Sequence, residues 1–200
     1  MCIICASPKG VKQPDEYTIR TMFARNPHGA GYMFARDGKV TISKGYMNID
    51  DFLFAIASED FTDSDPVVYH FRISTQAGVN PAMTHPFPLS NRRAHMKALD
   101  VICRCGVAHN GIIKLTSDPN QKEYSDTAIF ITDYLAKMVR NPKDLHNPEV
   151  MREVWNLAQS KFAILDGTGY IATVGHFINI DGIRYSNGSF SPWADRSAAV

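Results

Sequence analysis

Strand-type patterns occupy both ends of this 200-residue chain, and helical patterns lie between them. Near the C-terminus, short alternating segments are separated by Asp166-Gly167 and Asp181-Gly182, which are typical of tight hairpin turns. Helices are expected at 126–139, capped by Ser125 or Asp126, and at 148–159. Strands first, helices next and strands last predict sheets packed against helices, in one α+β domain that spans residues 1–200.

Local signals predict the remaining elements. Two earlier helices are expected at 15–24 and 49–57, the second after an Asn48 cap. The predicted strands cover residues 2–5, 32–36, 40–43, 67–73, 101–109, 162–165, 170–174, 177–180 and 183–186. Residues 74–100 hold Gly, Pro, Asn and Ser at the density of a loop.

Charge and cysteine content exclude several classes of protein. The chain has 21 Lys and Arg against 20 Asp and Glu, so no broad basic face for nucleic-acid binding is expected. No apolar run reaches the roughly 18 residues of a membrane span, and the N-terminus lacks the pattern of a secretory signal. The four cysteines, at positions 2, 5, 103 and 105, do not form a disulfide framework. A reducing, cytoplasmic setting is therefore expected.

Cys2 is the first candidate for catalysis. Its side chain is small enough for the initiator Met1 to be removed, which would give Cys2 both a thiol and a free α-amine. The amine has a pKa of about 8 and the thiol of about 8.5, so the amine can take the thiol proton. The thiolate can then attack an electrophilic carbon. Many chains begin Met-Cys by chance, so the other segments must decide.

Three further segments each have a structural and a functional interpretation. Arg72, at the end of a predicted strand, suits bidentate capture of a carboxylate or a plain surface ion pair. Asn110 and Gly111 form either a turn or an oxyanion hole, in which an amide and a backbone N–H meet a developing negative charge. Asp126 either belongs to a helix cap or meets a substrate ammonium group.

In combination these segments resemble the class II glutamine amidotransferase domain, a branch of the N-terminal-nucleophile hydrolases. The resemblance covers residues 2 to about 190, and its motifs stand in the family's order. They are Cys2, Asn26-Pro27-His28-Gly29-Ala30-Gly31, residues 70–75, His85-Pro86-Phe87, His109-Asn110-Gly111 and Ser125-Asp126-Thr127, followed by Asp181-Gly182 and Tyr185-Ser186-Asn187 as in small members.

The resemblance implies a four-layer α-β-β-α sandwich and a glutaminase reaction. Cys2 would attack the side-chain amide of L-glutamine, and Asn110 with the N–H of Gly111 would stabilise the oxyanion. Ammonia would leave, and hydrolysis of the γ-glutamyl thioester would release glutamate. No metal and no cofactor is expected, because the histidines and cysteines lack the spacing of metal ligands.

The resemblance also implies how the substrate is held. Arg72 would bind the α-carboxylate of glutamine and Asp126 its α-ammonium, a pair of opposite charges that suits a zwitterion. Thr75 would help to shape the pocket, and Gln76 stands where the family commonly has His. His70 and His109 are expected to hold strand ends through ring hydrogen bonds.

The glutaminase-like region takes up nearly every residue, which leaves no room for an acceptor domain. A stand-alone glutaminase subunit is therefore expected, with ammonia passing to a separate synthetase or amide-acceptor protein. Two alternatives remain open. The chain could hydrolyse another γ-glutamyl or related amide with the same residues. It could also be a degenerate domain that binds a ligand without catalysis.

Overall fold

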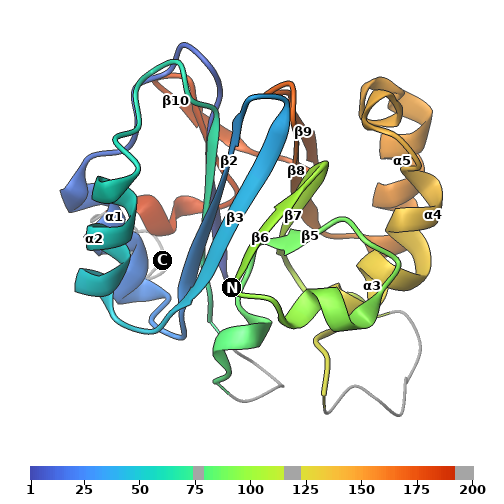
Figure 1. The fold of residues 1–200 in the computed structure, drawn as a ribbon, viewed down its shortest axis with the longest axis horizontal. Helices are drawn as coiled ribbons and strands as arrows, with labels where there is room; N and C mark the ends of the chain where they lie inside the picture. Colours follow the sequence, from blue (N-terminus) through green and yellow to red (C-terminus); the bar gives the residue numbers. More distant parts are fainter. Residues whose placement is uncertain (74–78, 115–122, 192–200) are drawn as a thin grey trace, which may run out of the picture.

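The computed structural model describes residues 1–73, 79–114 and 123–191. Their strands pair antiparallel throughout and form one sheet of seven strands and one of four. Helices pack against both sheets (Figure 1). The predicted α+β class is therefore confirmed.

The larger sheet carries the start of the chain in its interior. Its strand order is β10 (Ile178–Ile180), β11 (Ile183–Tyr185), β1 (Ile3–Ser7), β4 (Val67–Phe71), β2 (Ala30–Arg36), β3 (Lys39–Tyr46) and β6 (Asp100–Cys103). Every residue of β1 is buried. Cys2 therefore lies at the end of a strand that has neighbours on both sides.

The smaller sheet has the order β5 (Phe87–Pro88), β7 (Cys105–Asn110), β8 (Lys161–Asp166) and β9 (Ile171–Val174). All six residues of β7 are buried, so this strand fixes Asn110 at its end. The two predicted hairpins near the C-terminus are confirmed, but they belong to different sheets: β8 pairs with β9, and β10 with β11.

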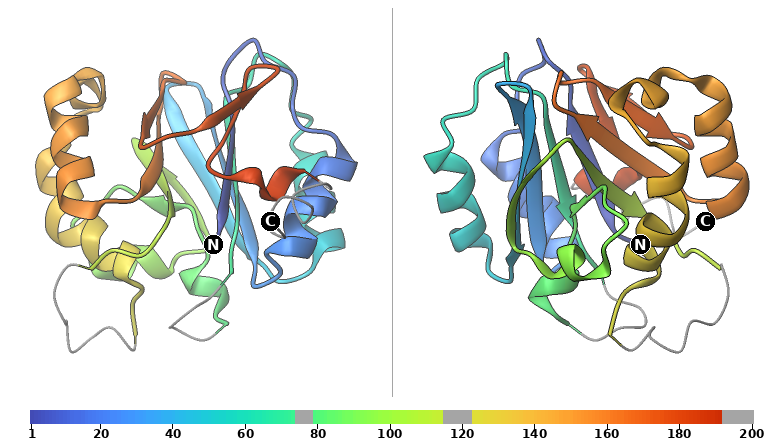
Figure 2. Two further views of the ribbon diagram at one scale, coloured as in Figure 1. Left: turned by 180° about the vertical axis from the view of Figure 1, so that it is seen from behind. Right: turned by 45° about the vertical axis from the view of Figure 1, so that its right-hand side comes forward.

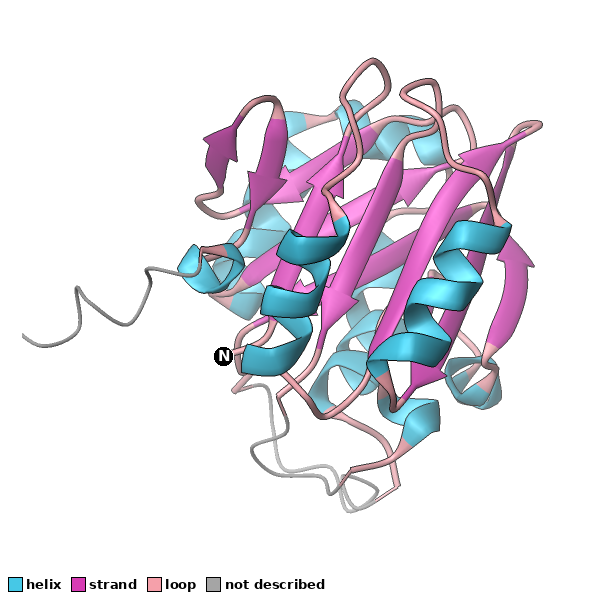
Figure 3. Ribbon diagram, turned by 90° about the vertical axis from the view of Figure 1, so that its left-hand side faces the viewer, coloured by secondary structure: helices cyan, strands magenta, loops and turns pink. Residues whose placement is uncertain are grey.

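Helices cover the outer face of each sheet. Figure 3 shows α1 (Glu16–Arg25) and α2 (Ile49–Ser58) over the larger sheet. The smaller sheet is covered by α3 (Asp126–Phe130), the π-helical η4 (Ile131–Leu135), α4 (Ala136–Met138) and α5 (Pro148–Ala158). Short 3₁₀ helices are η1 (Pro81–Met83), η2 (Arg93–Lys97), η5 (Pro142–His146) and η6 (Gly188–Phe190). In the described ranges, no helix combines the length and apolar character needed to cross a membrane.

The core has three parts. One lies between each sheet and the helices that cover it, and the third lies between the two sheets. Between the sheets, Ile4 and Met33 of the larger sheet belong to the same buried cluster as Ala108 and Leu165 of the smaller one. The order of elements through the molecule is helices, larger sheet, smaller sheet, helices (Figure 2). Burial of these apolar faces is the main favourable term for such a domain.

Cap residues place the helices where the sequence predicts them. The Asp15 carboxylate accepts from the Thr18 N–H at 2.8 Å, and the Asn48 side chain accepts from the Asp50 N–H at 2.7 Å. Pro148 occupies the first turn of α5, where its missing N–H has no cost.

Two predictions about residues 74–109 are wrong. The single strand expected over 101–109 is two strands, because the chain crosses at Arg104 from the larger sheet, where β6 pairs with β3, to the smaller sheet, where β7 pairs with β8. The Cys103 thiol donates to the Cys105 carbonyl at 3.1 Å across this break. The expected loop after β4 contains η1, β5 and η2. Alternating residues continue through such a crossing, so periodicity alone does not reveal it.

Candidate active site

The Cys2 thiol lies where β1 begins and the chain leaves β4. Its Sγ accepts from the Ile73 N–H at 3.4 Å and lies 3.6 Å from the Ile73 carbonyl oxygen. Burial raises the pKa of this thiol, and the Ile73 N–H, the amino terminus of the chain and Arg72 oppose the rise. At neutral pH the thiol is therefore mostly protonated, and a base must take its proton before it can act as a nucleophile.

Arg72 is buried, with only 5% of its surface exposed. The turn at 26–31 holds its backbone: Arg72 N–H donates to the Gly29 carbonyl at 2.8 Å, and its carbonyl accepts from His28 N–H at 2.9 Å. Burial lowers the pKa of the guanidinium, while the Cys2 thiol and the Asp126 carboxylate oppose the decrease. These opposing effects indicate that the Cys2 thiol and the Asp126 carboxylate are both near the Arg72 guanidinium.

Asp126 is the first residue of α3, and Ser125 is the cap, accepting from the Ala128 N–H at 3.2 Å. The main chain fixes the Asp126 carboxylate. One oxygen accepts from the Ile113 N–H and the other from the Thr127 N–H, each at 2.8 Å. The half-buried carboxylate is thus oriented by the loop that follows Gly111 as well as by its own helix.

Asn110 and Gly111 end β7 in a geometry that restricts both positions. The Asn110 side chain is 4% exposed and donates through Nδ2 to Ser186 Oγ at 2.9 Å. Gly111 has φ +151°, and a Cβ there would lie 2.5 Å from the Cβ of Ser160, so only glycine fits. This tight backbone turn is compatible with both of the predicted interpretations, a turn and a pair of oxyanion donors.

Ser186 and Asn187, to which the sequence assigns no role, contact the candidate site residues Asn110 and Cys2. Ser186 forms two hydrogen bonds of 2.9 Å with Ile4. The Ser186 N–H donates to the Ile4 carbonyl, and the Ile4 N–H donates to Ser186 Oγ. Asn187 Nδ2 donates to the Cys2 carbonyl at 2.5 Å. These contacts tie the residues after β11 to the strand of the nucleophile. Ile4 and Cys2 lie more than 180 positions away, so the motif Tyr185-Ser186-Asn187 gives no indication of these contacts.

No protein-family model matches this chain, and no curated protein is significantly similar to it. Functional inference therefore depends on the geometry around Cys2, Arg72, Asn110 and Asp126.

His70 and His109, at or near the ends of β4 and β7, are buried and form hydrogen bonds through their rings, as predicted. His70 Nε2 contacts the His109 carbonyl oxygen at 2.9 Å. The two ring nitrogens of His109 contact Thr127 Oγ1 at 2.7 Å and Ser160 Oγ at 2.8 Å. Burial lowers the pKa of His70 to about 3 and that of His109 to about 4. Both rings are neutral at physiological pH and are poor proton acceptors for Cys2.

Lys44 is a buried amine to which no sequence pattern pointed. It is 3% exposed, and its Nζ donates to the carbonyls of Ala82 and Met96, each at 2.8 Å. Nζ also lies 3.8 Å from the centre of the Phe87 ring. Burial lowers the pKa of Lys44 to about 6. Lysine in a strand is usually exposed, so nothing in the sequence marked this one as buried.

Two predicted substrate-binding residues, Thr75 and Gln76, lie outside the described residues.

Within the described ranges no group of His, Cys, Asp and Glu is arranged to hold a metal ion, and all four cysteines are free thiols. Cys2 is therefore available for thiol chemistry.

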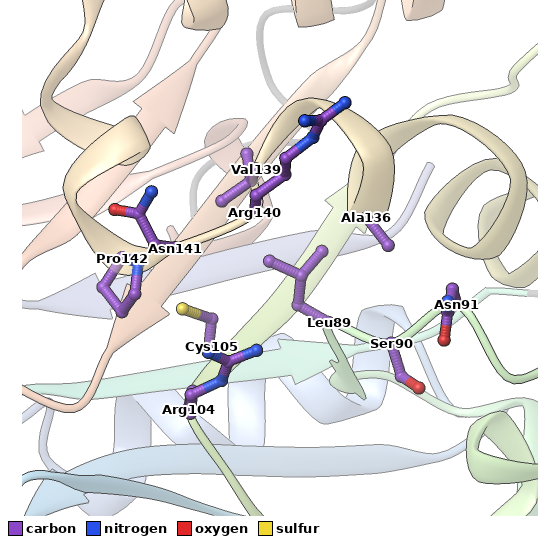
Figure 4. A pocket seen from close by; sticks show the side chains of 10 residues that line it. All are labelled: Leu89, Ser90, Asn91, Arg104, Cys105, Ala136, Val139, Arg140, Asn141 and Pro142. Carbon is purple, nitrogen blue, oxygen red and sulfur yellow. The ribbon is translucent and has the colours of Figure 1, made fainter.

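A cavity of about 230 Å³ lies between the smaller sheet and the helices that cover it (Figure 4). Its lining residues are Leu89, Ser90, Asn91, Arg104, Cys105, Ala136, Val139, Arg140, Asn141 and Pro142. The lining contains none of the candidate site residues. Its cysteine is 3% exposed, and burial raises the pKa of that thiol to about 11, which makes Cys105 a poor nucleophile.

Proposed function

We propose that this chain is the glutaminase subunit of a glutamine amidotransferase, with the four-layer α-β-β-α sandwich of the N-terminal-nucleophile hydrolases. The observation that carries the proposal is that Cys2 Sγ accepts from the Ile73 N–H at 3.4 Å and therefore lies next to the buried Arg72. The Cys2 thiol and the Asp126 carboxylate both oppose the lowered pKa of Arg72, which supports a common neighbourhood. Cys2 directly precedes β1, Arg72 directly follows β4 and Asp126 begins α3, so three separate elements support these residues.

The charges of the site suit the head group of L-glutamine. The Arg72 guanidinium binds the α-carboxylate, and a planar fork of N–H donors fits a carboxylate through two hydrogen bonds. The Asp126 carboxylate, already oriented by two backbone N–H groups, binds the α-ammonium. The side chain of glutamine then extends toward Cys2, which is half-buried near Arg72.

The α-amine of Cys2, exposed by removal of Met1, is the base in this proposal. Met1 is 80% exposed and therefore accessible to an aminopeptidase. Burial raises the pKa of the thiol, so an adjacent proton acceptor is needed, and the low pKa values of His70 and His109 make those rings unsuitable. An amine with a pKa of about 8 can accept the proton near neutral pH.

The reaction then proceeds in two steps. The thiolate attacks the side-chain carbonyl carbon of glutamine, and the resulting oxyanion accepts hydrogen bonds from Asn110 Nδ2 and the Gly111 N–H. The intermediate collapses, and the C–N bond breaks as the α-ammonium of Cys2 gives the proton taken from the thiol to the amide nitrogen, which leaves as ammonia. Water then attacks the thioester, releasing glutamate and regenerating the thiol. Ammonia passes to an acceptor on a separate protein.

The test is glutamine hydrolysis by the purified protein and by Cys2→Ala, with glutamate and ammonia measured together. Cys103→Ala is the matched control, because Cys103 is another partly buried thiol that lies on β6. We expect Cys2→Ala to abolish release of both products and Cys103→Ala to preserve it. Glutamate release retained by Cys2→Ala would refute the proposal. Turnover of γ-glutamyl peptides without turnover of glutamine would reassign the substrate.

A further inference from the structure

Ser186 links the strands that carry the proposed nucleophile and the proposed oxyanion donor. It follows β11 and has no exposed surface. Its Oγ lies 2.9 Å from the Ile4 nitrogen, in the larger sheet, and 2.9 Å from Asn110 Nδ2, in the smaller one. Lys161, paired with Asn110 in the register of β7 and β8, donates to the Ser186 carbonyl at 2.6 Å. One hydroxyl thus connects the two sheets at the site.

The hydrogen bonds of this cluster are incomplete as they stand. Ser186 Oγ accepts from both Ile4 and Asn110, while Asn110 Oδ1 is buried with no partner among the described residues. A buried acceptor without a partner costs about 1–3 kcal/mol. An unpartnered atom at the end of β7 therefore marks the position where the amide of Asn110 has capacity for a further contact.

A rotation of the Asn110 amide by half a turn would pair its oxygen with the Ser186 hydroxyl and leave the N–H groups of Nδ2 free for a ligand. The rotation exchanges the oxygen and the nitrogen of the amide with almost no change in shape. The Ser186 O–H then donates to Oδ1 while its oxygen still accepts from the Ile4 N–H. Nδ2 moves to the place of the unpartnered oxygen, where its N–H groups can meet an anion. In the opposite orientation, the amide oxygen would face and repel that anion.

We propose that Ser186 is a positioning residue that holds the Asn110 amide with its N–H group toward the oxyanion of the reaction. This inference rests on the proposed function, because it assigns Nδ2 to the tetrahedral intermediate. Ser186 itself touches neither substrate nor reacting atoms. It acts by donating the hydrogen that only the oxygen of the Asn110 amide can accept.

Kinetics of Ser186→Ala provide the first test. We expect kcat for glutamine to fall by about 10- to 100-fold, somewhat less than the 10²–10³-fold typical of deleting an oxyanion donor, with KM changed by less than about 3-fold. In an Asn110→Ala background, Ser186→Ala should cause no further loss, because its effect passes through Asn110. Additive losses in the double variant would overturn the assignment.

Two companion variants guard against a trivial loss of folding. Ser186→Cys keeps a similar shape with a weaker donor, so we expect an intermediate kcat, and this variant carries the test if Ser186→Ala does not fold. Ser43→Ala removes another buried hydroxyl, which contacts Tyr46 and Asp100, and should leave kcat unchanged. A kcat for Ser186→Cys equal to that of the unsubstituted protein would count against the proposal.

Two readouts separate this inference from the proposed function. Alkylation of Cys2 by iodoacetamide forms no oxyanion, so its rate should be the same in Ser186→Ala; a matching loss there would mean general damage and overturn the assignment. If the unsubstituted protein does not hydrolyse glutamine, the proposed function fails. The Ser186 contact is then read from the Asn110 side-chain amide signals in a ¹⁵N NMR spectrum. We expect Ser186→Ala to shift the Asn110 side-chain amide signals, and unshifted signals would overturn the assignment of Ser186 as a positioning residue.

Discussion

The Asp126 carboxylate both accepts backbone hydrogen bonds and, in the proposed function, binds the α-ammonium of the substrate. Its two oxygens accept backbone N–H groups from Ile113 and Thr127, so its position does not depend on a substrate. The carboxylate also opposes the lowering of the Arg72 pKa by burial. A negative charge held in this way should matter for binding an ammonium group more than for the chemical step.

Asp126→Asn tests that separation. The amide oxygen of Asn can still accept a backbone N–H, so the fold should survive, but the charge is lost. We expect KM for glutamine to rise by about 10-fold or more, as for loss of a charged hydrogen bond, with a smaller change in kcat. Asp133→Asn is the control. Asp133 lies in η4, which directly follows α3, and it pairs with Arg93 at 2.7 Å rather than with a candidate site residue. Equal KM values in the two variants would contradict the role of Asp126.

The candidate site residues that the sequence predicts stand in recognisable local contexts. Cys2 is next to the initiator Met, and Arg72, Asn110 and Asp126 lie at the ends of predicted elements. Ser186 could not be assigned a role from the sequence, because its partners Ile4 and Asn110 are 182 and 76 positions away. The contact with Ile4 exists only once β1 has paired with β11, and the contact with Asn110 only once the two sheets have packed.

The hairpin turns of the two sheets meet at Gly38 and Gly167. Gly38 belongs to the turn between β2 and β3, and Gly167 to the turn between β8 and β9. A Cβ on Gly167 would lie 2.1 Å from the Gly38 carbonyl oxygen. Because this neighbour is backbone rather than a flexible side chain, one hairpin would have to move to admit a larger residue.

We therefore expect Gly167→Ala to lower the free energy of unfolding by about 1–3 kcal/mol, the usual range for overpacking. The measurement is urea denaturation followed by circular dichroism. Gly188→Ala is the matched control, since a Cβ at this position would have no atom within 4 Å and its φ is not positive. A Gly167→Ala midpoint equal to that of Gly188→Ala would show that the hairpins are not in this contact.

Individual elements were easier to predict than their assignment to sheets. Helices α2 and α5 begin where Asn48 and Pro148 indicate, because capping depends on neighbouring residues only. The crossing at Arg104 was missed, because which sheet a strand joins depends on partners distant in sequence. The same reasoning explains why the two C-terminal hairpins were predicted without their separate sheets.

For the molecule as a whole, burial of Lys44 makes stability depend on pH. The folded chain releases the Lys44 proton near pH 6, whereas the ordinary lysine value is 10.5. Between these values the unfolded state binds more protons, so this residue makes the free energy of unfolding rise with pH across that window. At lower pH both states are protonated, and the dependence disappears.

Lys44→Met removes that dependence while keeping a long side chain beside Phe87. We expect the free energy of unfolding to rise less steeply between about pH 6 and 10 in the variant than in the unsubstituted protein. Urea denaturation at several pH values measures both slopes. Lys39→Met, on the same strand but exposed, should keep the original slope. Identical slopes for Lys44→Met and Lys39→Met would show that Lys44 keeps its proton in the folded chain.

The most direct measurement is the intact mass of the purified protein before and after treatment with a diazo-ketone analogue of glutamine. The initial mass shows whether Met1 has been removed, as the use of the Cys2 α-amine requires. We predict a processed chain that gains a single adduct, with no adduct on Cys2→Ala. A processed, folded chain that takes no adduct, or one still labelled in Cys2→Ala, would contradict the assignment of Cys2 as the nucleophile of a glutamine site.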